Sequence, residues 1–240
     1  SEEFIFSEIY KMKPDVLGFS CYIWNIEMIL NIVSVIKKIL PNTKIILGGP
    51  EVSHEYEYLF QRGADIITIG EGERTSFEII SFLKDKNKNL SDIDGIAYHD
   101  EEKIIVTKKR TPLTLDDIPF VYDDFSIEEL QNKIIYYETS RGCPYNCQYC
   151  LSSIEKGVRF LSKERAFKDL KFFLDKKVKQ VKFVDRTFNC NKKFAVEIWE
   201  FLIKNDNGIT NFHFEISADI IDDDMLNVLK KARKQLSSLK

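Results

Sequence analysis

Residues 134–150 read IIYYETSRGCPYNCQYC, and this stretch decides how the second half of the chain is interpreted. Residues 134–139 are rich in β-branched and aromatic side chains, which are typical of a strand. Cys143, Cys147 and Cys150 follow at once, with the spacing C-x3-C-x2-C. We therefore expect three thiols on one loop that begins where a strand ends.

The chemistry of this loop follows from its ligand type. Thiolates are soft ligands that suit iron–sulfur clusters and zinc. Three of them can hold three irons of a four-iron cubane and leave the fourth iron without a protein thiolate. Structural zinc sites and simple electron-transfer clusters normally use four ligands. The three histidines are remote in sequence, and no fourth cysteine is spaced to help. The spacing favours an incompletely ligated cluster, with zinc or plain electron transfer as the alternatives.

Strand and helix signals alternate on the C-terminal side of this loop. Hydrophobic patterning predicts further strands at 180–185 and 212–217, with helices at 164–174 and 192–204 and a last helix capped by Asp222. Three strand–loop–helix units resemble part of a β/α barrel, in which chemistry collects at the carboxyl ends of the strands. A full barrel has eight such units, so we expect the barrel to be partial and truncated.

The N-terminal side has the same alternation. We predict strands at 15–20, 43–48 and 65–70, helices at 2–12, 26–40 and after 72, and an edge hairpin of 96–98 with 104–106. A strand that should precede the first helix is absent, so we expect truncation at this end too.

Residues 108–133 show neither the periodicity of a helix nor that of a strand. They contain Pro112, Pro119 and two acidic pairs, and we interpret them as a linker. The predicted organisation is an α/β domain over 1–107, a linker over 108–133 and a partial barrel over 134–240.

The cysteine motif and its position after the first barrel strand resemble the radical S-adenosylmethionine (SAM) superfamily. The resemblance implies that Cys143, Cys147 and Cys150 bind a [4Fe–4S] cluster whose open iron chelates SAM. It implies that an electron from the cluster cleaves SAM to a 5′-deoxyadenosyl radical, which takes a hydrogen atom from the substrate. The substrate would be a small or unknown molecule, and the electron donor a flavodoxin or ferredoxin.

Four other residues are expected to contribute to this site, and the resemblance implies the roles of Tyr149 and Asp185. Tyr149 occupies the aromatic place that is set against adenine. Asp185, at the end of the second strand, is expected to hold the SAM amino group, and Arg186 to neutralise its carboxylate. Glu215 is expected to reach SAM or substrate. The structural alternatives are a helix cap or an Asp185–Arg186 ion pair, and a paired structural carboxylate at Glu215.

The first half resembles the cobalamin-binding Rossmann-like (flavodoxin-like) domain that precedes many radical SAM cores. The resemblance rests on the segments DVLGFS at 15–20, GGPEVS at 48–53 and GEGE at 70–73. It implies cobalamin contacts at Ser20, Gly48, Gly49, Gly70, Glu71 and Gly72. The D-x-H-x-x-G signature that supplies a cobalt ligand in other cobalamin proteins is absent from the sequence. The alternative is a purely structural domain.

These expectations combine into one function, which is radical SAM chemistry with possible methyl transfer through cobalamin. The open alternatives are a non-catalytic cofactor-binding module and an inactive fragment with a cluster or zinc.

The composition argues against several classes of protein. The 240 residues include 35 Lys and Arg against 38 Asp and Glu, which argues against a protein built to coat nucleic acid or a membrane surface. No uncharged apolar run approaches the roughly 18 residues of a membrane helix. Three of the five cysteines crowd into eight residues, unlike a secreted disulfide framework. We therefore expect a reducing, cytoplasmic location.

Overall fold

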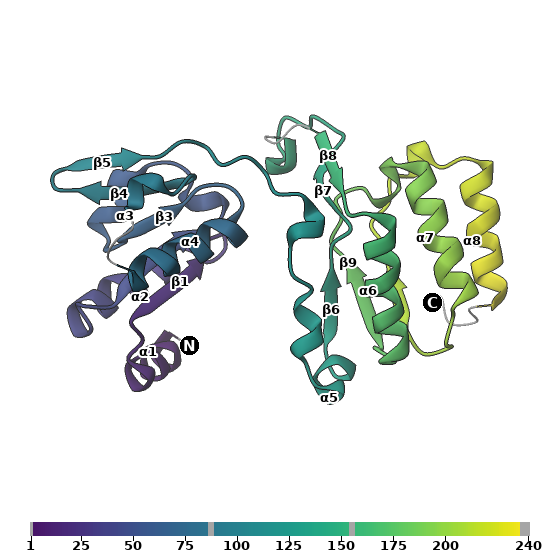
Figure 1. Ribbon diagram of the computed structural model, residues 1–240, viewed down its shortest axis with the longest axis horizontal. Coiled ribbons are helices and arrows are strands. Elements are labelled where there is room, and N and C mark those ends of the chain that lie inside the picture. Colours follow the sequence, from purple (N-terminus) through teal and green to yellow (C-terminus); the bar gives the residue numbers. More distant parts are fainter. Residues whose placement is uncertain (1, 86–88, 154–156, 236–240) are drawn as a thin grey trace. The chain divides into compact units, whose positions relative to one another are not determined.

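The computed structural model describes residues 2–85, 89–153 and 157–235 and divides the chain into two compact units (Figure 1). Unit 1 comprises residues 1–112 and unit 2 comprises residues 113–240. Both are mixed α/β structures built around parallel strands, as predicted. Each unit is described by itself.

Unit 1 is an α/β sandwich around a five-stranded sheet with the order β1-β2-β3-β4-β5. Its elements are α1 (Glu2–Met12), β1 (Val16–Ser20), α2 (Ile26–Ile39), β2 (Lys44–Gly48), α3 (Tyr56–Gln61), β3 (Ile66–Thr68), α4 (Gly72–Lys84), β4 (Ile96–Asp100) and β5 (Lys103–Val106). The first three strands are parallel, and β4 and β5 form the predicted antiparallel hairpin at the edge. Helix α3 was not anticipated, because only six residues form it.

Helices cover both faces of this sheet. Ile45 and Leu47 of β2 pack with the helices α1, α2 and α3, whereas Ile46 between them packs on the opposite face with Ile79 of α4. Alternate side chains of a strand point to opposite faces, so a strand buried on both faces is apolar throughout. The carboxyl ends of β1, β2 and β3 are thereby left at one edge of the sheet.

Unit 2 is built on a three-stranded parallel sheet with the order β10-β9-β6. Its helices and strands are α5 (Ile127–Gln131), β6 (Ile134–Tyr137), β7 (Ser140–Cys143), β8 (Gly157–Phe160), α6 (Lys163–Asp175), β9 (Gln180–Phe183), α7 (Lys192–Lys204), β10 (Asn211–His213) and α8 (Asp223–Gln235). Asp222 caps α8 as predicted, because its Oδ1 accepts the N–H of Met225 at 3.0 Å.

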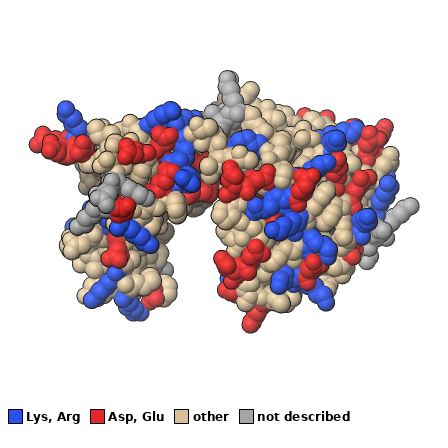
Figure 2. Space-filling view, viewed as in Figure 1, with Lys and Arg blue, Asp and Glu red and all other residues tan. Residues whose placement is uncertain are grey.

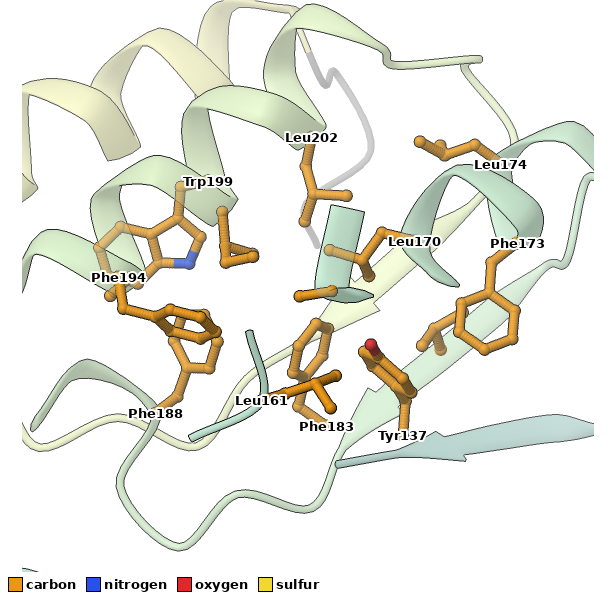
Figure 3. Close-up of a cluster of buried hydrophobic side chains, with 14 of the residues drawn as sticks. Tyr137, Leu161, Leu170, Phe173, Leu174, Phe183, Phe188, Phe194, Trp199 and Leu202 are labelled. Carbon is orange, nitrogen blue, oxygen red and sulfur yellow. The ribbon is translucent and has the colours of Figure 1, made fainter. Parts of the chain in front are cut away.

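An aromatic core joins the sheet to its helices (Figure 3). Phe183 of β9 contacts Phe188 and Phe214, with ring centroids 5.2 and 4.3 Å away. Phe173 and Trp199 close the core from α6 and α7. Paired aromatic rings add stabilisation beyond their buried area, so this cluster holds the loops at the carboxyl ends of the strands in place.

The segment 108–133 differs from the predicted linker. Leu115 and Leu130 are buried in the core of unit 2, and Asp116 accepts hydrogen bonds from the N–H and hydroxyl of Ser162, at 3.1 and 2.9 Å. Prolines and acidic pairs break helical and strand periodicity, but they do not prevent an irregular segment from packing. Residues 113–133 are therefore part of unit 2.

The cysteine segment differs too. Where the sequence predicts one long loop, Ser140–Cys143 (β7) pairs antiparallel with Gly157–Phe160 (β8), so the first cysteine ends a strand. Gly142 has a φ of +110°, and a Cβ there would collide with the backbone of Gly157. This close approach explains why glycine precedes the first cysteine.

Candidate functional site

Three segments meet at the carboxyl ends of the strands in unit 2. The cysteine loop follows β7, residues 185–190 follow β9, and residues 214–219 follow β10. The second and third segments are joined by a pair of hydrogen bonds, in which Asn189 donates to the carbonyl of Ser217 and accepts its N–H, both at 2.8 Å. The first is joined to the third through Tyr145, whose hydroxyl lies 3.0 Å from that of Ser217.

Asp185 ties the second segment to the base of the cysteine hairpin. Its carboxylate accepts hydrogen bonds from the Thr139 N–H at 3.1 Å, the Thr139 hydroxyl at 2.7 Å and the Ser140 hydroxyl at 2.5 Å. Asp185 is buried, and this desolvation raises the pKa of its carboxyl while the three hydrogen bonds oppose the rise. The carboxylate is thus engaged by the two residues that open the hairpin.

The three cysteines are half-buried. Hydrogen bonds from the N–H and hydroxyl of Ser152 lower the pKa of the Cys150 thiol, and the charge of Arg186 acts in the same direction. A lowered pKa favours the thiolate, which is the metal-binding form. The loop also turns between the last two cysteines, because the Cys150 N–H donates to the carbonyl of Cys147 at 3.1 Å.

The positions of the cysteines can be compared with the ligand geometry that a single metal ion requires and with the geometry that a four-iron cluster requires. Within the described residues, no group of three or more His, Cys, Asp or Glu side chains is close enough to hold one metal ion. A four-iron cluster distributes its thiolates over separate irons and so accepts wider spacing than one tetrahedral ion. The donor set, the turn and the stabilised thiolate at Cys150 fit a cluster.

The other predicted SAM residues lie around this loop. Arg186 is exposed and close enough to influence Cys150. Tyr149 is 93% exposed, so its ring is available to a ligand. Glu215 lies two residues beyond the end of β10, is exposed and faces Lys182 at 3.5 Å. The structure does not test their predicted contacts with SAM, which stay predictions.

Sequence reasoning missed two features of this site. Tyr145, which lies between the first two cysteines, hydrogen-bonds to Asp219 as well as Ser217 and thereby attaches the cysteine loop to the segment after β10. In addition, Tyr136, Lys182 and His213 are neighbours across β6, β9 and β10, on the sheet face away from the aromatic core. Strand alternation is the signal that predicts such a row.

The predicted cobalamin residues gather at the carboxyl edge of the sheet in unit 1. Ser20 ends β1, Gly48 ends β2, and Gly70, Glu71 and Gly72 join β3 to α4. A Cβ on Gly70 would meet no atom within 4 Å, and its φ is +83°. Gly49 differs, because a Cβ there would lie 2.5 Å from the carbonyl oxygen of Cys21. Packing between loops therefore explains Gly49, whereas the surface at Gly70 is open.

An apolar loop follows β1 at the same edge. The rings of Tyr22 and Trp24 stack with centroids 4.6 Å apart, and Ile23 and Trp24 are each 76% exposed. Asn25 fixes the loop by accepting the Tyr22 N–H at 2.7 Å and donating to the Ser20 carbonyl at 3.0 Å. Large exposed apolar groups mark binding surfaces. The run of apolar residues directly after a strand was the available signal.

Comparison with known protein families assigns both units. The B12 binding domain family matches residues 1–80, and the radical SAM superfamily matches residues 137–238. The chain belongs to the radical SAM superfamily, in the group with an N-terminal B12-binding domain.

Curated relatives of this radical SAM chain include methyltransferases. An uncharacterized methyltransferase of Pyrococcus horikoshii, PH0819, is 30% identical over 82% of the chain and 46% of its own length. The cobalamin-dependent radical SAM methyltransferase TokK of Streptomyces tokunonensis is 26% identical over 77% of the chain and 28% of its own length. The chain thus spans less than half the length of these relatives.

Solved structures show the same fold. The cobalamin-dependent SAM radical enzyme OxsB, solved with aqua-cobalamin and SAM bound, matches 96% of the chain with a TM-score of 0.74 and 24% identity. The match covers 35% of the OxsB chain. TsrM from Kitasatospora setae, solved with cobalamin and a [4Fe–4S] cluster, matches 96% of the chain and 48% of its own with a TM-score of 0.69 and 14% identity.

Two surface properties of this radical SAM chain bear on its partners. Among the helices in the described ranges, none is long and apolar enough to cross a membrane. On the face drawn in Figure 2, basic and acidic side chains are interspersed rather than gathered into a patch of one sign. This view shows no extended basic surface of the kind that binds nucleic acid.

Proposed function

We propose that this chain carries the cofactor-binding part of a cobalamin-dependent radical SAM methyltransferase that acts on a small molecule. The observation that carries the proposal is the cysteine hairpin at the carboxyl end of a parallel sheet, fastened by Asp185 to β9 and by Tyr145 to the segment after β10. In a β/α barrel, this end of the sheet is where reacting groups gather.

The residues of the chain divide the work at the cluster. Cys143, Cys147 and Cys150 supply three thiolates, and Ser152 with Arg186 favours the ionised form of the third. When bound, the cluster supplies the electron that cleaves SAM reductively. In this proposal Arg186 receives the carboxylate of SAM and Tyr149 its adenine, and the exposure of both side chains is compatible with these roles. We assign Asp185 the structural role of holding the hairpin, in preference to a direct contact with SAM.

The carboxyl edge of unit 1 supports the cobalamin part of the proposal. A corrin ring needs an open surface with apolar cover, because it is broad and largely apolar on its faces. Gly70 provides the open surface, and the stacked Tyr22 and Trp24 provide apolar cover at the same sheet edge.

Iron binding tests the cluster. Anaerobic reconstitution with iron and sulfide is expected to give about four irons per chain, and Cys147→Ala should lose most of them. Cys190→Ala is the matched control, since this cysteine lies outside the motif and should keep the iron. Retention of all iron in Cys147→Ala, or one zinc per chain in place of iron, would overturn the ligand assignment.

Two glycine variants test the cobalamin surface. Gly70 and Gly208 both have positive φ and open space around a built Cβ, but only Gly70 lies at the predicted site. Alanine should strain the backbone at both positions by about 1 kcal/mol. Titration with hydroxocobalamin should show binding weakened about tenfold or more in Gly70→Ala alone. Equal affinity in the two variants would place cobalamin elsewhere.

A further inference from the structure

Thr187 is a buried residue beside the cysteine loop that the proposed function leaves unused. It is 6% exposed, and its Oγ1 lies 3.8 Å from the Sγ of Cys143. Among the described residues, this sulfur is the hydrogen-bond partner of the Thr187 hydroxyl, and no other is found. Buried hydroxyl groups normally have a partner, so the contact with sulfur accounts for an otherwise unsatisfied group.

The backbone around Thr187 and the backbone around Cys143 are each fixed by further contacts. The carbonyl of Thr187 accepts the N–H of Cys190 at 3.1 Å, and Asp185, two residues earlier, is fixed by Thr139 and Ser140. Cys143 is held by its register with Gly157 in the hairpin. The contact therefore belongs to the frame that joins the hairpin to the end of β9.

The direction of the hydrogen bond follows from the state of the sulfur. In a thiol, either group can donate. In a thiolate that ligates iron, the sulfur has no proton, so the Thr187 hydroxyl must donate. Hydrogen bonds to cluster sulfurs favour the more electron-rich, reduced cluster and so raise its reduction potential.

We propose that Thr187 is a positioning and tuning residue, whose hydroxyl donates to the cluster ligand Cys143 and raises the reduction potential of the cluster. This inference rests on the proposed function, because it needs a cluster at the three cysteines. The step concerned is the gain of one electron by the cluster from dithionite, and the hydroxyl keeps its proton throughout.

The test is a redox titration of the reconstituted full chain, followed by electron paramagnetic resonance. Thr187→Val keeps the branched shape and removes the hydroxyl, whereas Thr187→Ser keeps the hydroxyl. Thr210→Val controls for the loss of a buried hydroxyl in the same unit. Thr210 is 5% exposed and lies just before the amino end of β10, whereas the cysteine loop lies at the carboxyl ends of the strands. Iron content is measured for every protein.

We expect Thr187→Val to bind the same iron as the wild type but with a more negative midpoint. At the wild-type midpoint, its ratio of reduced to oxidised cluster should fall about threefold or more. Thr187→Ser and Thr210→Val should remain within error of the wild type.

An unchanged midpoint in Thr187→Val would overturn the inference while leaving the cluster assignment intact. If that variant holds no cluster, Thr187→Ala is titrated instead. Loss of cluster from both would assign Thr187 to folding alone and also overturn the inference. A wild type without iron would instead contradict the proposed function.

Discussion

Asp185 shows how one side chain can organise the site. Its buried carboxylate accepts from three donors of Thr139 and Ser140. Replacing it with alanine removes the acceptor of all three groups, and buried donors without partners are costly. We expect Asp185→Ala to lower the free energy of unfolding of unit 2 by about 2–4 kcal/mol.

Chemical denaturation measures this loss. Asp175→Ala is the control, because this aspartate lies at an exposed end of α6, paired with Lys171, and should cost less than about 0.5 kcal/mol. Equal, small effects in both variants would show that the Asp185 carboxylate is kept for a ligand and has no part in holding the hairpin.

Individual residues could be predicted from sequence only where local spacing carries the information. The three cysteines can be proposed as ligands because their spacing is itself a chemical signature. The position of Asp185 at a strand end was also predictable, but its partners lie 45 and 46 residues away in the chain and follow from strand pairing. Tyr145 and Thr187 were missed for the same reason.

Among the elements, the segment 113–125 matters because it packs along unit 2 with only two short 3₁₀ helices, Leu115–Asp117 and Val121–Asp124, and without an α-helix or a strand. Arg165 of α6 clamps it by donating to the carbonyls of Asp116 and Ile118 at 3.2 and 3.1 Å, while also binding the buried Asp169 at 3.0 Å. Arg165→Met keeps the aliphatic length but leaves the buried Asp169 without its ion-pair partner, so that its carboxylate keeps only the hydrogen bond from the Tyr137 hydroxyl. We expect the free energy of unfolding to fall by about 3 kcal/mol and the segment 113–125 to become sensitive to protease.

Lys171→Met on the same helix removes an exposed pair with Asp175 and should change the free energy of unfolding little. Matching protease resistance in Arg165→Met and the wild type would mean that Arg165 does not secure the segment.

Regular elements were largely predictable and irregular ones were not. The apolar strands and amphipathic helices have periods that a sequence displays directly. The segment 113–125 and the β7–β8 hairpin have no such period, because their conformation depends on contacts with distant residues, such as Asp116 with Ser162. For this reason a linker and a loop were expected where packed structure is found.

In the molecule as a whole, two α/β units each present the carboxyl ends of parallel strands. Unit 1 has open glycine backbone and exposed aromatic rings there, and unit 2 carries the three thiols on the loop that follows β7. Both families matched by the chain fit this division of labour. The chain matches 46% of the length of PH0819 and 28% of the length of TokK.

The central claim is that three cysteines hold a four-iron cluster with one iron open to SAM. The most direct measurement is the electron paramagnetic resonance spectrum of the reconstituted, dithionite-reduced chain, recorded with and without SAM. We expect a cubane signal whose g-values shift when SAM is added, because in the proposed function SAM binds the open iron. A cubane signal that SAM leaves unchanged, or the absence of any cluster signal in a protein with full zinc content, would contradict it.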